Sequence, residues 1–145
     1  MSAAVIADIT RKLGGVSVLG SAVSSQSDLA ALVSRKLPLE TLRGLVSAGI
    51  SEQEIDVLVI PQRTRRHRAA KNQPLTVDES DRTVRLLRIQ TLAENTFEDV
   101  GQAAIWLRRS LGELGDTTPL DMAQTEAGAR VVETILGKIA WGAAA

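Results

Sequence analysis

Apolar residues recur at spacings of three and four along most of the chain, and no segment alternates in the way a half-buried strand does. This pattern predicts a protein built only of helices, an all-α fold. We expect helices that begin near residues 28, 38, 51, 62, 77, 96 and 125, with a short turn of helix near residue 119. The segment from Val77 to Asn95 has the broadest apolar face, which suits a bundle core or a dimer seam.

Polar residues and prolines mark where these helices should start. The expected N-caps are Ser27 for the helix over 28–36, Ser51 with Glu54, Thr76 with Glu79, and Thr96 with Asp99. Pro38 takes a first-turn position, and the helix after it carries Leu39, Leu42 and either Val46 or Leu45 on its apolar side before Gly49 ends it. Residues 1–26 mix a short apolar pattern with Gly14 and Gly15, so we expect a flexible or partly helical N-terminal arm.

Composition narrows the class of protein. The chain has 145 residues, 44% of them hydrophobic, and no cysteine, which excludes disulfides, thiolate metal sites and cysteine nucleophiles. No apolar run approaches the roughly 18 residues of a membrane span, and the N-terminus lacks the charge order of a secretory signal. The expectation is a soluble cytoplasmic protein with no membrane partner.

The formal net charge of zero hides an asymmetry between the two halves. Residues 1–77 hold ten Lys or Arg and six Asp or Glu, whereas residues 78–145 hold seven and eleven. The strongest concentration follows Pro61, where one short stretch contains five cations and no acid: Arg63, Arg65, Arg66, Arg68 and Lys71. Such a run is a solvated face, a disordered tail or a phosphate-binding surface.

The residues before this basic run favour the phosphate-binding surface. A short amphipathic segment over 51–58 and a turn at residues 59–61 precede it, which is the layout of a helix-turn-helix. Five side chains spaced by about 100° cannot all enter one groove. We expect Arg63, Arg66 and Thr64 to face the DNA, Arg68 and Lys71 to touch its backbone, and Arg65 to belong to the same DNA-binding surface.

Candidates for catalysis or metal binding are weak. His67 is the one histidine, and it has no cysteine or acid cluster beside it. Ser80, Asp81 and Arg82 are explained by the start of a helix rather than by a nucleophile and its orienting partner. Trp106 is expected in the core, and Trp141 is either a packing anchor at the terminus or part of a partner interface. No catalytic residue, metal site or cofactor is predicted.

Several ordered motifs resemble one known family. The run from Leu75 to Arg82 resembles the start of the toxin-binding domain in the Xre/MbcA/ParS antitoxin family. Five later motifs follow in the family's order: Ala104 to Leu107, Leu114-Gly115, Thr118 to Asp121, Thr125 to Ala129, and Leu136 to Gly142. The likeness spans about residues 38–142.

The resemblance implies a function that the residues alone do not show. It implies a non-enzymatic antitoxin that neutralises an NAD-depleting RES-domain toxin by covering its active site, and that represses its own operon by binding operator DNA as a homodimer. It implies an N-terminal Xre-like helix-turn-helix domain over 27–73 and a toxin-binding and dimerisation domain over 74–145. Lys138, Trp141 and Gly142 are then the expected toxin-interface residues.

Two other interpretations stay open at this point. One is a stand-alone helix-turn-helix transcriptional regulator whose C-terminal half only dimerises. The other is a small helical hydrolase, which is disfavoured by the single histidine and by the absence of cysteine and tyrosine.

Overall fold

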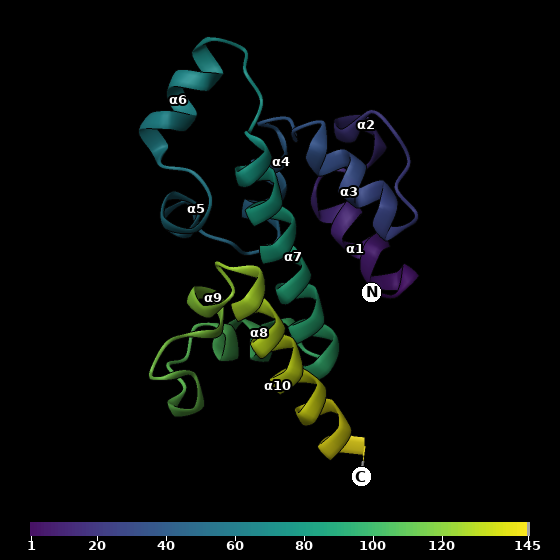
Figure 1. The fold of residues 1–145 in the computed structure, drawn as a ribbon, viewed down its shortest axis with the longest axis vertical. Coiled ribbons are helices and arrows are strands. Elements are labelled where there is room, and N and C mark those ends of the chain that lie inside the picture. Colours follow the sequence, from purple (N-terminus) through teal and green to yellow (C-terminus); the bar gives the residue numbers. More distant parts are fainter. Residues whose placement is uncertain (145) are drawn as a thin grey trace. The chain divides into compact units, whose positions relative to one another are not determined.

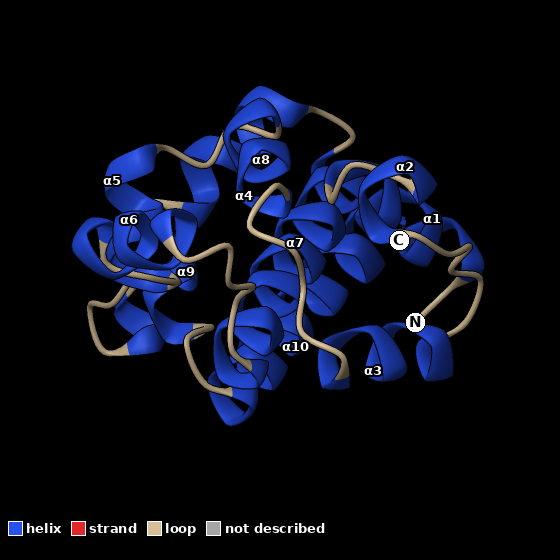
Figure 2. Ribbon diagram, turned by 90° about the horizontal axis from the view of Figure 1, so that it is seen from above, coloured by secondary structure: helices blue, strands red, loops and turns tan. Residues whose placement is uncertain are grey.

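The chain is helical, and helices account for nearly all of its regular structure (Figures 1 and 2). The computed structural model describes residues 1–144. Within them, the only β-type pairing is an isolated bridge between Leu111 and Thr117. The chain divides into two compact units, Met1–Val84 and Arg85–Ala145, and the boundary falls inside one long helix.

The first unit contains six helices and the start of a seventh. They are α1 (Ala3–Lys12), α2 (Val16–Leu19), α3 (Gln26–Ser34), α4 (Thr41–Ser47), α5 (Glu52–Leu58), α6 (Gln62–Ala70) and the first turns of α7 (Val77–Phe97). The second unit holds the rest of α7, then α8 (Val100–Leu107), a 3-10 turn (Gly112–Leu114), α9 (Pro119–Met122) and α10 (Glu126–Ala144). The all-helical prediction is confirmed.

Three predicted helix starts were wrong by a few residues. Ser25, not Ser27, caps α3, because its hydroxyl oxygen accepts from the amide of Asp28 at 3.1 Å. Helix α4 begins at Thr41, after a turn that starts at Pro38. Its apolar side uses Leu45, since Val46 is exposed.

The third of these corrections concerns Thr96. It is the penultimate residue of α7, where its hydroxyl donates to the carbonyl of Leu92. The cap of α8 is Asp99, whose carboxylate accepts from the amide of Gln102 at 2.8 Å. The predicted capping boxes of Ser51 with Glu54 and of Thr76 with Glu79 are both confirmed.

Of the two predicted alternatives for residues 1–26, the structure shows the partly helical arm, and its helix α1 is packed and not flexible. Its apolar residues Val5, Ile6 and Ile9 are buried, and the helix lies against α4. The two backbones come together at Gly44, where an added Cβ would lie only 1.8 Å from the carbonyl oxygen of Lys12. A residue without a side chain is therefore required there for α1 to dock.

Polar side chains at the start of α7 hold the first unit together. The hydroxyl of the buried Ser80 accepts from the amide of Leu37 at 2.9 Å, and Arg82 donates to the carbonyl of Val59 at 3.0 Å. Glu79 forms an ion pair with Arg68 of α6 and also accepts from the amide of Thr76. These bonds explain why the first unit extends to Val84 and does not end near residue 73.

The Glu79 carboxyl group stays ionised in spite of its burial. Burial alone would raise its pKa, but the hydrogen bonds from Arg68 and Thr76, together with the positive charge of Arg68, lower the pKa below the ordinary value of 4.5. The side chains of Arg68 and Glu79 are only 16% and 8% exposed. A pair this sheltered loses little of its attraction to solvent screening.

The second unit is organised by two arginines of α7. Arg85 is buried and donates to the carbonyls of Ala123 at 3.0 Å and Gln124 at 2.7 Å, directly after α9. Arg88 forms ion pairs with Glu126 and Glu133 of α10. Because a cation is favourable at a helix C-terminus, Arg85 stabilises the turn between α9 and α10.

The close approach of α1 and α4 gives a stability test. Replacing Gly44 with Ala should lower the free energy of unfolding by about 1–3 kcal/mol or more, because the new methyl group overlaps the Lys12 carbonyl. The matched control is Gly137→Ala in α10, where a Cβ would meet no described atom within 4 Å. This change should raise stability by about 0.5–1 kcal/mol. Urea denaturation followed by circular dichroism measures both, and equal effects would contradict the packing of α1.

The Arg68–Glu79 pair gives a pH test. Glu79→Gln should lower the free energy of unfolding at pH 7 by about 1–3 kcal/mol, since Arg68 loses its charged partner. The folded pKa is depressed, so the contribution is complete above 4.5 and disappears as the pH falls through the folded value. The difference in unfolding free energy between wild type and variant should therefore shrink in acid.

Glu40→Gln, at an exposed residue without a capping bond, serves as the control. A difference that does not vary with pH would refute the role of the ion pair.

Candidate nucleic-acid and toxin interfaces

Helix α6 carries the basic run and buries none of its residues. Arg63, Arg66 and Lys71 are exposed, and Thr64 and Arg65 are half-buried. Pro61 is the N-cap residue that precedes α6, and just after the helix the amide of Gln73 donates to the carbonyl of Arg68. The predicted basic helix is present, and it presents most of its cations to solvent.

Arg68, which the sequence predicted to touch the DNA backbone, forms an ion pair within the first unit. Its guanidinium pairs with Glu79, which the sequence had marked only as a capping residue. Since no residue of α6 is buried, this ion pair is a main attachment of the helix to the rest of the unit. Arg68 therefore positions α6, and the cations free to meet a phosphate are its neighbours.

Two helix pairs in the first unit are joined by tight turns. Helices α5 and α6 are linked through Val59, Ile60 and Pro61, as the sequence predicted. Helices α4 and α5 are linked through a turn that contains Gly49 at a φ of 100°. A short turn with a glycine is characteristic of a helix-turn-helix. From the sequence, Gly49 was expected only to end the preceding helix, so this second turn was not predicted.

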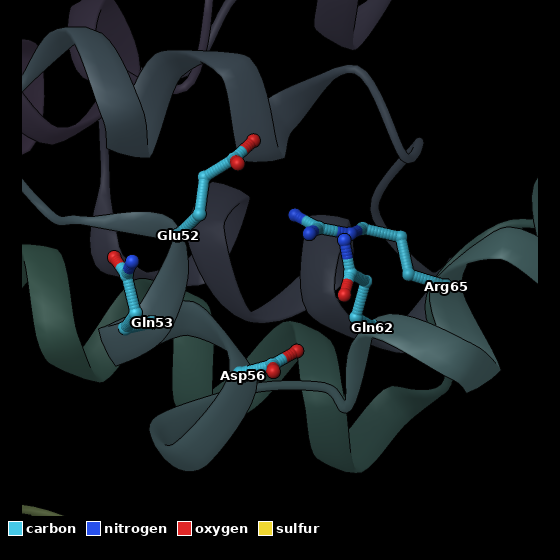
Figure 3. A pocket seen from close by; sticks show the side chains of 5 residues that line it. All are labelled: Glu52, Gln53, Asp56, Gln62 and Arg65. Atoms are coloured by element: carbon cyan, nitrogen blue, oxygen red, sulfur yellow. The ribbon is translucent and has the colours of Figure 1, made fainter.

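A small open hollow lies between α5 and α6 (Figure 3). Glu52, Gln53 and Asp56 of α5 and Gln62 and Arg65 of α6 line it. The side chains of Glu52 and Arg65 extend toward each other across the hollow. This arrangement was not predictable from the sequence, because the two groups of charged residues lie on separate helices and only the angle of the turn brings them together.

The expected toxin-interface residues lie near the end of α10. Lys138, Trp141 and Gly142 are all exposed, and the indole of Trp141 is the most exposed large apolar side chain of the described residues, at 79%. Trp106 is instead half-buried, with its ring 5.6 Å from that of Phe97. Of the two tryptophans, Trp141 is the one available to a partner.

The described part of the chain offers little support for metal binding, nucleophilic catalysis or membrane insertion. His67 is exposed on α6, and residues 1–144 contain no group of three or more metal-ligating side chains placed to hold an ion. Ser80, a nucleophile candidate by residue type alone, is buried, and its hydroxyl oxygen accepts a hydrogen bond from the amide of Leu37. None of the helices described is long and apolar enough to cross a membrane.

Comparisons with known proteins agree with the division into two parts. Residues 28–88 match the antitoxin Xre-like helix-turn-helix domain, and residues 92–142 match the antitoxin Xre/MbcA/ParS C-terminal toxin-binding domain. The run from Leu75 to Arg82, which the sequence analysis assigned to the toxin-binding domain, thus belongs to the helix-turn-helix domain. Its hydrogen bonds to α6 and to the residues around Leu37 and Val59 give the physical reason.

Several curated proteins are similar to the chain. The antitoxin Xre of Pseudomonas putida is 42% identical over 84 residues, which cover 58% of this chain and 53% of that protein. The antitoxin Xre of Photorhabdus laumondii is 40% identical over 68 residues, or 46% of each chain. The Prs ADP-ribosylating antitoxin of a Sphingobium species is 28% identical over 131 residues, covering 83% of this chain and 82% of that protein.

The order of the two matched domains, the polar contacts within each unit and these relatives lead to one assignment. The chain carries an Xre-like helix-turn-helix domain over residues 28–88, followed by a C-terminal toxin-binding domain of the Xre/MbcA/ParS antitoxin type over residues 92–142.

Proposed function

We propose that this antitoxin neutralises a RES-domain toxin that depletes NAD, and that it represses its own operon by binding operator DNA. The observation that carries the proposal is the pairing of a toxin-binding domain with a helix-turn-helix domain in one chain. The Sphingobium relative is named for ADP-ribosylation, a reaction that consumes NAD, which supports an NAD-linked toxin. The cytoplasmic location expected from the sequence stays a prediction.

Toxin neutralisation requires coverage of an active site and no chemistry from the antitoxin. The end of α10 offers Trp141 as a large rigid anchor, with the cation of Lys138 three residues earlier. Exposed tryptophans of this kind often dominate the energy of an interface. We infer that this end of α10 lies against the toxin and blocks access to its NAD-binding pocket.

Operator binding would use the exposed cations of α6. Arg63, Arg66 and Lys71, with the half-buried Arg65, are placed to contact phosphates, while Thr64 adds a neutral donor. A homodimer would set two such helices about one turn of DNA apart, roughly 34 Å, and would favour an inverted repeat. Arg68 contributes by holding α6 in position through Glu79.

The direct test is co-expression with the protein encoded by the neighbouring gene. A RES-domain partner that co-purifies with this chain, and that stops growth when expressed alone, supports the proposal. A chain that purifies only with itself and still binds its promoter would instead favour a stand-alone transcriptional regulator.

The toxin interface gives a specific prediction. Trp141→Ala should weaken binding to the cognate toxin by about 2 kcal/mol, or roughly 30-fold, because an interface anchor is lost. Val131→Ala removes an exposed apolar side chain (45% exposed) from the same helix and should have little effect. Calorimetric titration and rescue of growth measure the two variants. Unchanged neutralisation by the Trp141 variant would remove this residue from the interface.

The DNA interface gives a prediction about salt. If each protomer neutralises four phosphates, the slope of log affinity against log salt should be roughly −3.6 per protomer. Arg63→Ala with Arg66→Ala should make that slope less steep by roughly 1.8. The control is Arg35→Ala with Arg43→Ala, two exposed arginines outside α6. Fluorescence anisotropy across a salt series gives the slopes, and a nearly flat wild-type slope would exclude phosphate binding by α6.

A further inference from the structure

The hollow between α5 and α6 brings acidic side chains to the surface proposed for DNA. Glu52 and Asp56 are exposed and lie one helical turn apart on α5. They line the same hollow as Arg65 of the basic helix (Figure 3). A surface built only to bind phosphates would gain nothing from two carboxylates at this place.

The helix cap and the apolar packing of α5 do not use these two carboxylates, although Glu52 lies in the first turn, where an acid is favourable. The capping box of α5 uses Ser51 and Glu54, and the apolar side of the helix uses Ile55 and Leu58. The Glu52 and Asp56 carboxylates instead extend from α5 into the open hollow. Their negative charge therefore acts mainly on whatever approaches the α5–α6 surface.

We propose that Glu52 and Asp56 are specificity-determining residues that weaken sequence-independent DNA binding by this antitoxin. The inference rests on the proposed operator binding. Sequence-independent DNA binding comes almost entirely from phosphate contacts. A carboxylate that repels phosphates and attracts Arg65 therefore lowers the affinity of this binding to the full extent. A specific complex has one fixed register, in which the two carboxylates stand over the open groove and away from the backbone.

The physical principle is that specificity is a difference between two affinities. A repulsive group that penalises the wrong complexes more than the right one increases that difference, even though it lowers both affinities. Arg63 and Arg66 supply the attraction from the exposed side of α6. Glu52 and Asp56 supply the repulsion from α5, and the hollow is where the two effects meet.

The test compares the full-length wild type with a Glu52→Gln, Asp56→Asn double variant. Two labelled duplexes of equal length serve as probes: the fragment immediately upstream of the chain's own gene, and a scrambled sequence of the same composition. The matched control, Glu40→Gln with Glu113→Gln, also removes two exposed carboxylates but leaves the hollow unchanged. Thermal unfolding of each protein shows whether it is folded.

The double variant should bind the scrambled duplex roughly fivefold more tightly at low salt. It should bind the upstream fragment with a smaller gain, so the ratio of the two affinities falls by about twofold or more. Added salt should reduce both gains, because it screens exposed charges. The control variant should change both affinities little and equally.

Four results would overturn the proposal. Weaker binding of the upstream fragment by the double variant would mean that the carboxylates accept hydrogen bonds from base edges. An equal gain in the control variant would mean that only net charge matters. If no folded protein of the set binds either duplex at low salt, operator binding itself fails, and the inference fails with it. A wild type that binds the upstream fragment, next to a double variant with an unchanged affinity ratio, would refute this inference and leave operator binding intact.

Discussion

The ion pair between Arg68 and Glu79 fixes the basic helix α6 to the rest of the first unit. Helix α6 buries no side chain, so the hydrophobic effect does little to hold it in place. A sheltered carboxylate with a lowered pKa takes that role, and the same carboxylate caps the start of α7. The orientation of α6 is therefore set by Glu79, a residue outside this helix. Because Glu79 holds Arg68 on the inner side of α6, the other cations of the helix lie toward the solvent.

Helix α7 makes polar contacts in both units. Its first turns contact the first unit, and its later turns contact the second. Glu79, Ser80 and Arg82 tie α7 to the segments before it, and Arg85 and Arg88 tie it to the segments after it. One continuous helix thus contributes buried polar contacts to both family domains. This explains why the motif from Leu75 to Arg82, which resembled part of a toxin-binding domain, matches the helix-turn-helix domain: its bonds belong to the first unit.

Local patterns predicted most of the fold, and tertiary contacts account for what they missed. The two capping boxes and the long helix from Val77 were predictable because each depends on residues within one turn. The cap of α3 was misplaced because Ser25 and Ser27 are equivalent in propensity. The burial of α1, the pairing of Arg68 with Glu79 and the hollow at Glu52 and Arg65 join residues distant in sequence or on separate helices. The spacing of apolar residues within a single helix carries no information about such contacts.

In the proposed function, one chain carries two separate partner surfaces, α6 for DNA and the end of α10 for a toxin. Native mass spectrometry of the purified chain, mixed with its cognate toxin and a duplex from its own promoter, shows whether both surfaces are used at once. We expect one assembly that contains the antitoxin, the toxin and the DNA together. An antitoxin that holds either partner but never both would contradict separate surfaces, and one that holds no toxin would contradict the proposed function.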